Sequence, residues 1–308
     1  MTGDVVVALD VGGTGMKCGL VRRDGTVHHT ERHPTLAGRG PEAVTADILD
    51  IAAGLADRAR ADGLHPVAAG VAVPGVVDEE TGTAVWSSNI GFRDVPLRDL
   101  VAARVGLPSV LGHDVRAGGM AEARVGAGRD QRHVLFIAIG TGIAAAHVVD
   151  GRAFAGAHGA AGEVGHIIVR PGGPPCNCGA RGCLESIASA SAVGRRYVQL
   201  SGDEGVTAYD VAHRAAAGEE LANTVWTEAV EAFADGLLTA QALYDAGVVV
   251  LGGGLAEAGE ALLAPLRIAL AARITFHRVP TIVRAALGDT AGCLGAALLA
   301  LDSLESDT

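Results

Sequence analysis

The sequence predicts an α/β protein built from two related halves. One local pattern occurs three times: a short apolar run typical of a buried strand, followed at once by a glycine-rich turn. The three runs are Val5–Leu9, His133–Ile139 and Val248–Leu251. Hydrophobic residues make up 49% of the 308 residues and aromatic residues only 3%, so we expect a core made mainly of Ala, Val, Leu and Ile.

Extended and helical patterns alternate through the first half. Lys17–Arg22 is a second extended run, which predicts a hairpin with Val5–Leu9. Pro41–Asp62 has apolar residues at helical spacing and a proline in its first turn, where the missing N–H costs no hydrogen bond. Val67–Val73 is a buried strand that ends at a Pro-Gly pair. The remaining predictions are a helix at Leu97–Val105, a strand at Ser109–Leu111 and a helix at Val115–Arg124.

The second half repeats the hairpin and ends in helices. Ile143–Val149 follows His133–Ile139 after a short Gly-Thr-Gly turn, and Glu219–Tyr244 predicts one long helix. The remaining predictions are a helix at Glu257–Arg273, a strand at Thr281–Leu287, a closing helix at Ala291–Leu301 and a frayed end at Glu305–Thr308. We expect a smaller domain at 1–112, a larger one at 113–289, and a final helix, about 290–304, that packs back on the first.

Charge and composition exclude several classes of protein. The net charge of -11 leaves no basic face for nucleic acid or for an acidic membrane. No apolar run reaches the roughly 20 residues that span a bilayer, and the N-terminus has no signal-peptide pattern. We therefore expect a cytoplasmic protein with neither nucleic-acid nor membrane partners. In that reducing compartment, five cysteines are poor evidence for disulfides.

The turn after the first strand has the composition of a phosphate-binding loop. Gly12 and Gly13 allow close approach of the backbone to an anion, and successive N–H groups in such a turn form an anion site. Thr14 adds a hydroxyl and Lys17 a positive charge, while Asp10 can hold Mg²⁺. A plain glycine-rich hairpin is the alternative for this stretch.

Two further glycine turns suit a nucleotide. Gly140-Thr141-Gly142 offers a second phosphate turn, and the bare backbone of Gly252–Gly254, Gly253 and Gly254 above all, suits the flat face of adenine. Helix entry explains the last turn equally well. There is no G-x-x-x-x-G-K-[ST], so the chain is not a P-loop enzyme, and no G-x-G-x-x-G opens a βαβ unit.

A cysteine cluster is the most specific local signal. Cys176, Cys178 and Cys183 supply three thiolates within eight positions, and His166 lies ten residues upstream across a Gly- and Pro-rich loop. Together they make a closed Cys₃His set for tetrahedral Zn²⁺, which we expect to be structural. Cys18 and Cys293 lie in apolar runs and are interpreted as small core residues.

Carboxylates flank these features. Asp114 lies between a strand and a helix, where it could accept a proton in phosphoryl transfer, although a helix N-cap is the ordinary interpretation. Glu163 and Glu185 stand on either side of the cysteine cluster, and a loop folded around zinc would bring them together. Carboxylates beside an imidazole suit the neighbouring hydroxyls of a sugar.

These motifs together resemble the ROK family of repressors, open reading frames and sugar kinases, over nearly the whole chain. A-L-D-V-G-G-T-G-M-K resembles its first phosphate motif, and G-A-A-G-E-V-G-H with C-N-C-G-A-R-G-C-L-E resembles its sugar-and-zinc signature. The resemblance implies an actin-like ATPase fold of the ribonuclease H-like class, with two α/β domains around a nucleotide and sugar cleft, often as a homodimer or homotetramer.

The resemblance also implies site residues. Asp114 would be the base and Asp10 would lie near Mg²⁺. The sugar would be bound by Gly75, Ser88, Asn89, Asp114, Glu163, His166 and Glu185, with His166 also binding zinc. Family kinases usually have Asn where this chain has His113, an imidazole that can still donate to a sugar hydroxyl, and more Gly where it has Ala144–Ala146. Because the phosphate loop begins at residue 10, we expect no N-terminal helix-turn-helix of the kind found in the family's repressors.

The sequence thus predicts an ATP-dependent hexose kinase of the glucokinase type. Asp114 would take the proton from a sugar hydroxyl as that oxygen attacks the γ-phosphorus of ATP. Glucose is the first expected substrate, with N-acetylhexosamines or amino sugars as alternatives, and polyphosphate is an alternative donor. A catalytically silent sugar-binding regulator of the same family is the competing class. The presence of Asp10, Asp114 and both phosphate turns argues against it.

Overall fold

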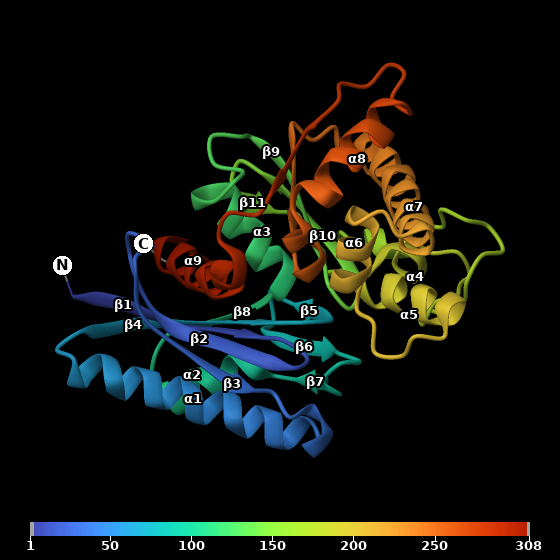
Figure 1. Ribbon diagram of the computed structural model, residues 1–308. Helices are drawn as coiled ribbons and strands as arrows, with labels where there is room; N and C mark the ends of the chain where they lie inside the picture. Colours follow the sequence, from blue (N-terminus) through green and yellow to red (C-terminus); the bar gives the residue numbers. More distant parts are fainter. Residues whose placement is uncertain (1–2, 307–308) are drawn as a thin grey trace. The chain divides into compact units, whose positions relative to one another are not determined.

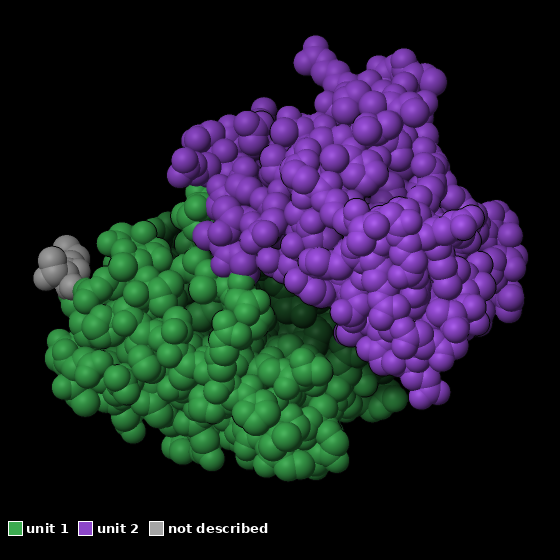
Figure 2. Space-filling model, viewed as in Figure 1, with its two compact units in different colours: residues 1–125, 153–161, 289–308 green, residues 126–152, 162–288 purple. Residues whose placement is uncertain are grey.

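The computed structural model describes residues 3–306. They form two compact units (Figures 1 and 2). Unit 1 holds residues up to 125, the segment 153–161 and the residues from 289 onward, and unit 2 holds residues 126–152 and 162–288. The predicted division after residue 112 differs from this one, because α3 (Asp114–Val125) packs against α9 (Ala291–Ser306) within unit 1.

Each of the two large sheets has five strands in the same arrangement. The first has the order β3-β2-β1-β4-β8, in which β1 is antiparallel to β2 and parallel to β4, and β4 is parallel to β8. The second, β11-β10-β9-β12-β13, repeats this pattern. The first sheet consists of β1 (Asp4–Val11), β2 (Gly15–Arg22), β3 (Val27–Pro34), β4 (His65–Val73) and β8 (Ser109–His113). The second consists of β9 (His133–Ile139), β10 (Ile143–Val149), β11 (Arg152–Ala153), β12 (Val248–Gly252) and β13 (Thr281–Arg284).

Helices cover both faces of the first sheet (Figure 1). On one face, α1 (Pro41–Ala61) and α2 (Leu97–Val105) bury the odd-numbered residues of β1, such as Val7 and Leu9. The intervening Val6 and Ala8 are also buried but face α9. A strand buried on both faces reads as a continuous apolar run, which is why Val5–Leu9 shows no alternation.

The approach of α9 to the first sheet is close enough to require glycine. A Cβ on Gly70 of β4 would lie 2.0 Å from the carbonyl oxygen of Ala296. A Cβ on Gly295 of α9 would lie 2.0 Å from the carbonyl oxygen of Ala117, in α3. These glycines set how near the last helix comes to residues far away in sequence.

Unit 2 buries its second sheet mainly against helices. Leu135 and Ile137 of β9 share a core with Phe233 and Leu237 of α7. The helices of this unit are α4 (Glu185–Ala188), α5 (Ala190–Ser201), α6 (Ala208–Ala216), α7 (Glu220–Tyr244) and α8 (Glu260–Ala271). The structure also contains a small sheet, β5 (Val76–Asp78), β6 (Thr83–Trp86) and β7 (Arg93–Val95), and four 3₁₀ turns, η1 (Ala37–Arg39), η2 (Val164–His166), η3 (Gly254–Ala258) and η4 (Gly288–Thr290).

Most element predictions agree with the structure to within two residues at each end, and three differ by more. The helix predicted from Glu257 begins at Glu260, because Gly259 has a φ of 56° and interrupts the turn η3 that precedes it. The strand predicted to Leu287 ends at Arg284, where pairing with β12 ends. The closing helix continues to Ser306, so the expected fraying at 305–306 is wrong, while 307–308 lie outside the described residues. Within residues 3–306, none of the helices combines the length and the apolar character that a bilayer crossing requires.

We predict that Gly70→Ala destabilises unit 1. The added methyl would collide with the backbone of α9, and such overpacking costs about 1–3 kcal/mol of unfolding free energy. Gly54→Ala is the matched control, since no atom lies within 4 Å of its Cβ position in α1, and it should gain about 0.5–1 kcal/mol. Urea denaturation measures both, and equal stabilities would contradict the prediction.

Candidate functional site

The site residues of unit 1 cluster at the carboxyl ends of parallel strands. Asp10 is near the end of β1, Gly75 follows β4, and His113 and Asp114 join β8 to α3. The registers pair Asp10 with Ala72 of β4, and Val73 with His113, so these ends lie at nearly one level of the sheet. Open α/β sheets bind ligands at this edge.

The predicted phosphate loop is a tight turn between β1 and β2. The N–H of Gly12 donates to the carbonyl of Gly15 at 2.9 Å. A Cβ on Gly13 would lie 3.1 Å from the Cβ of Asn89, so the loop contacts a residue predicted to bind sugar. Asn89 in turn accepts a hydrogen bond of 3.5 Å from the exposed hydroxyl of Ser88, while Thr14 is exposed. The loop and these two residues therefore form one surface of unit 1.

Asp10 is half-buried and lies against the N-terminus of α9. A Cβ on Gly292 would lie 2.2 Å from its Oδ2, so only glycine fits there. Burial raises the pKa of Asp10 to about 7, the nearby Asp114 acts in the same direction, and Lys17, its cross-strand neighbour, lowers it. The ammonium of Lys17 lies 3.5 Å from a carboxylate oxygen of Asp289. A desolvated carboxylate of this kind fits a divalent cation, which would restore its charged form.

Asp114 begins α3 with a partly exposed carboxylate. Its Oδ1 accepts the N–H of Val115 at 2.7 Å and lies 3.5 Å from Nε2 of His113. Burial raises the pKa of Asp114 to about 6, although the N–H of Val115 and the guanidinium of Arg116 lower it. The carboxyl therefore titrates close to physiological pH, in the range where a general base operates most effectively.

In unit 2, Glu185 is bound to the second phosphate turn. Its Oε2 accepts the N–H of Ile143 at 2.9 Å, and a Cβ on Gly142 would lie 2.5 Å from that same oxygen. The turn itself closes through a 2.9 Å bond from the N–H of Gly140 to the carbonyl of Gly142. Thr141, between these glycines, is exposed. Glu185, the first residue of α4, is thus bonded directly to the turn that follows β9.

Glu163 and His166 lie on a turn that packs tightly on β10. A Cβ on Gly162 would lie 2.0 Å from the carbonyl oxygen of Ala145, and one on Gly165 would lie 2.2 Å from that of Ile143. These approaches explain the two glycines of the G-E-V-G-H stretch. Because Glu185 is also bonded to Ile143, the two glutamates flanking the cysteines both belong to segments anchored on β10.

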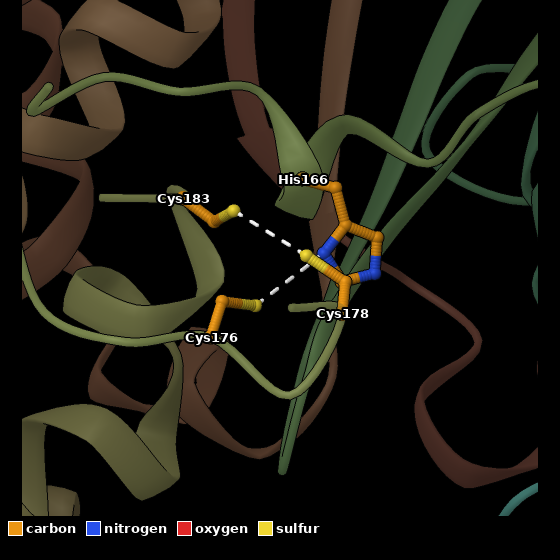
Figure 3. A group of neighbouring side chains, drawn as sticks. All are labelled: His166, Cys176, Cys178 and Cys183. Atoms are coloured by element: carbon orange, nitrogen blue, oxygen red, sulfur yellow. Dashed lines mark hydrogen bonds between the residues drawn. The ribbon is translucent and has the colours of Figure 1, made fainter. Parts of the chain in front are cut away.

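The four predicted zinc ligands converge (Figure 3). Their ligand atoms all lie within 4.8 Å of one another, with Nδ1 of His166 3.6 Å from Sγ of Cys176 and the sulfurs of Cys178 and Cys183 3.7 Å apart. A tetrahedral Zn²⁺ places neighbouring S and N ligands roughly 3.6–3.8 Å apart, so the set fits zinc. Nε2 of His166 lies 3.8 Å from Oε2 of Glu163, so a carboxylate stands near the other ring nitrogen, beyond hydrogen-bond distance.

A nucleotide-sized cavity adjoins the second phosphate turn. It has a volume of about 640 Å³ and is lined by Thr141 and by residues of α5 and the start of α6. A neighbouring cavity of about 200 Å³ shares Ala190 and Thr207 with it and extends to Gly254. A larger cavity of about 1070 Å³ along α5 and α7 has no predicted site residue among its described lining.

Among the lining residues of the 640 Å³ cavity the sequence analysis named only Thr141, and Ala190 and Thr207 are among those that it missed. Thr207 caps α6 through a capping box with Asp210, a Thr-x-x-Asp signal that is visible in the sequence. Gly253 has a φ of 82°, and its Cβ would lie 2.5 Å from the carbonyl oxygen of Ile139. Contact with β9 therefore requires glycine at position 253, whereas Gly254 lines the 200 Å³ cavity.

Comparison with known proteins identifies the family. The family model described as "ROK family" matches residues 6–303. The chain belongs to the ROK family. A glucokinase of Thermotoga maritima is 33% identical, over 95% of this chain and 96% of its own length. An N-acetylmannosamine kinase of Citrobacter koseri is 32% identical, over 96% and 98%.

A solved structure agrees with the fold. The ROK family glucokinase of Streptomyces griseus in complex with glucose and AMPPNP superposes with a TM-score of 0.82 at 30% identity, covering 97% of this chain and 99% of that one. The predicted family and the predicted actin-like ATPase fold are thereby confirmed.

We predict that Cys183→Ala removes a bound zinc ion. Metal analysis should find one zinc per chain in the wild type and almost none in the variant, because three ligands remain and Cys183 is the buried one. Loss of the metal should lower Tm and weaken sugar binding about 10–100-fold, since His166 and Glu163 lose their anchor. Cys18→Ala, at a buried cysteine outside the cluster, should keep the zinc. Equal zinc contents in the two variants would contradict the assignment.

Proposed function

We propose that this protein is an ATP-dependent hexose kinase of the ROK family, with glucose as its first substrate. The observation that carries the proposal is the Asp114 carboxylate, partly exposed at the end of β8 and with its pKa raised to about 6, on the same sheet edge as the phosphate loop. The glucokinase relative and the structure that holds glucose and AMPPNP support both the reaction and the nucleotide.

The proposed reaction uses the groups of unit 1 as follows. Asp114 accepts the proton of a sugar hydroxyl, which we expect to be O6. The hydroxyl oxygen bonds to the γ-phosphorus of ATP as the bond to the β-phosphate oxygen breaks, which yields the sugar phosphate and ADP. The N–H groups of Gly13 and Thr14 and the ammonium of Lys17 bind phosphate oxygens, while the N–H of Gly12, bonded to the carbonyl of Gly15, closes the turn. Asn89 and Ser88 bind the sugar.

Unit 2 supplies the remaining groups. The turn 140–142 binds phosphate oxygens, and the cavity that extends to Gly254 holds the adenine. Glu163, His166 and Glu185 bind sugar hydroxyls, as the resemblance implies. Zn²⁺ held by the Cys₃His set has no open position, so its contribution is to orient His166 and hence Glu163.

Asp10 is the residue that would hold Mg²⁺. When bound, Mg²⁺ supplies positive charge that offsets the charge of the phosphates during transfer. The pKa of about 7 supports this role, because a buried carboxylate that lacks a cation is easily protonated. Location in the cytoplasm and assembly as a homodimer or homotetramer stay predictions.

An N-acetylhexosamine is the second candidate substrate. The N-acetylmannosamine kinase of Citrobacter koseri is nearly as similar to this chain as the glucokinase of Thermotoga maritima. His113, in place of the usual Asn, changes the group beside the base. Its imidazole is larger than an amide and has a different set of donors and acceptors.

We predict that Asp114→Asn abolishes turnover while the protein stays folded and binds sugar. ADP release, measured with glucose, mannose, N-acetylated hexoses and amino hexoses, should fall about 10²–10⁴-fold in the variant. Because the folded-state pKa lies above the unfolded value, the ionised carboxylate destabilises the fold at pH 7.5, so the variant should have a higher Tm. Wild-type protein that binds sugars but releases no ADP with any of them would contradict the kinase assignment.

We predict an acidic limit to wild-type activity near pH 6. Only the ionised carboxylate of Asp114 can accept the proton, and burial raises its pKa to about 6, so kcat/KM for the sugar should fall about tenfold per pH unit below that value. Steady-state rates at limiting sugar between pH 5 and pH 8 measure this decline. A kcat/KM that stays constant down to pH 5 would contradict the assignment of Asp114 as a base with a raised pKa.

A further inference from the structure

A buried arginine lies in the first turn of α3, two residues after Asp114. Arg116 is only 3% exposed, and a cation at that depth is retained only with full hydrogen bonding. Its Nε and Nη2 donate to Oε1 of Glu79 at 2.9 and 2.8 Å, and its Nη1 donates to the carbonyl of Gly159 at 2.8 Å. The guanidinium therefore spans two acceptors on separate segments of unit 1.

Glu79 binds the backbone on the other side of Asp114 as well. Its Oε1 also accepts the N–H of His113 at 3.4 Å. One carboxylate oxygen thus receives hydrogen bonds from the residue before Asp114 and from the side chain two residues after it. These hydrogen bonds on either side of Asp114 fix the local backbone and therefore the orientation of the Asp114 side chain.

The same turn determines which nitrogen of His113 carries a proton. The N–H of Arg116 donates to Nδ1 of His113 at 3.4 Å, so Nδ1 is an acceptor and a neutral ring has its proton on Nε2. Burial and the charge of Arg116 lower the pKa of His113 to about 4, which keeps the ring neutral at pH 7. Nε2 is the atom 3.5 Å from Oδ1 of Asp114, so His113 presents an N–H donor beside the carboxylate.

Gly159, whose carbonyl is the second acceptor of the Arg116 guanidinium, belongs to the segment 153–161. Gly159 has a φ of 71°, and a Cβ on it would lie 2.6 Å from the carbonyl oxygen of Val77 in β5. The segment 153–161 therefore lies directly against β5, the strand that ends one residue before Glu79. In sequence, 153–161 leads into Gly162 and Glu163.

We propose that Arg116 is a positioning residue for the transfer reaction. Through Glu79 and the carbonyl of Gly159, it holds the turn that carries Asp114 against the segment 153–161. It also keeps His113 as an Nε2–H donor beside the Asp114 carboxylate. The inference rests on the proposed function, because it takes Asp114 as the base. Arg116 acts through these neighbours. Displacement of a catalytic group by about 1 Å can cost 10²-fold in rate.

The test compares Arg116→Met with Arg124→Met. Both residues are on α3, and Arg124, ten residues after Asp114, makes a two-point ion pair with Asp302 at 2.8 and 2.6 Å. Arg116→Met should lower kcat about 10–100-fold with KM for ATP within about twofold of wild type. Arg124→Met should leave both constants within about twofold. Arg116→Lys keeps the charge but lacks the fork that spans both acceptors, so its kcat should be intermediate.

Hydrogen exchange provides a readout that does not require turnover. Amides of 153–161 and of the first turn of α3 should exchange faster in Arg116→Met than in Arg124→Met. Equal exchange, or faster exchange with unchanged kcat, would overturn the proposal. If the wild type phosphorylates no hexose, the proposed function fails, and the exchange rates still decide whether Arg116 holds the segment. Should Arg116→Met not fold, Glu79→Gln gives the same comparison at a more exposed position.

Discussion

The close approach of α9 to the first sheet is the constraint on which the rest of unit 1 depends. Gly70 and Gly295 allow backbone to lie against backbone, where any side chain would collide. The same approach places Gly292, at the start of α9, against the carboxylate of Asp10 at the end of β1. Residues near opposite ends of the chain are therefore in direct contact. A change in the packing of α9 also changes the surroundings of Asp10, the proposed cation-binding carboxylate.

This packing leaves two carboxylates in surroundings that oppose their charged forms. Burial raises the pKa of both Asp10 and Asp114, and each carboxylate has a single nearby cation, Lys17 or Arg116, that acts in the opposite direction. Such incomplete compensation reduces stability near neutral pH, because the unfolded chain ionises these groups more easily. It is nevertheless what the proposed chemistry requires, since the proposed base needs a pKa close to the working pH and the proposed metal ligand needs a cation to complete it.

Sequence patterns predicted the parts of the fold and site that depend on neighbouring residues. His133–Ile139 and Leu97–Val105 have the predicted ends, and the four predicted zinc ligands, which lie within one short stretch of the sequence, converge. The small sheet β5–β7 was missed because its strands are three or four residues long and half exposed, too short to show a period. The partnership of Arg116 with Glu79 could not be predicted either, because it joins residues 37 positions apart and gives no local pattern.

The two sheets, although alike in strand arrangement, differ in the groups that they contribute. In the first hairpin Val11 pairs with Met16, and in the second Ile139 pairs with Ile143, so Asp10 corresponds to Ala138. The first sheet thus carries an acid at the position where the second carries a methyl group, and the second turn is one residue shorter. In unit 2, the turn after β9 is instead bonded to the side chain of Glu185, which follows Cys183 by two residues in the sequence. Two sheets with the same strand arrangement therefore carry different groups, Asp10 and Asp114 in unit 1 and, in unit 2, a turn bonded to Glu185 beside the Cys₃His cluster.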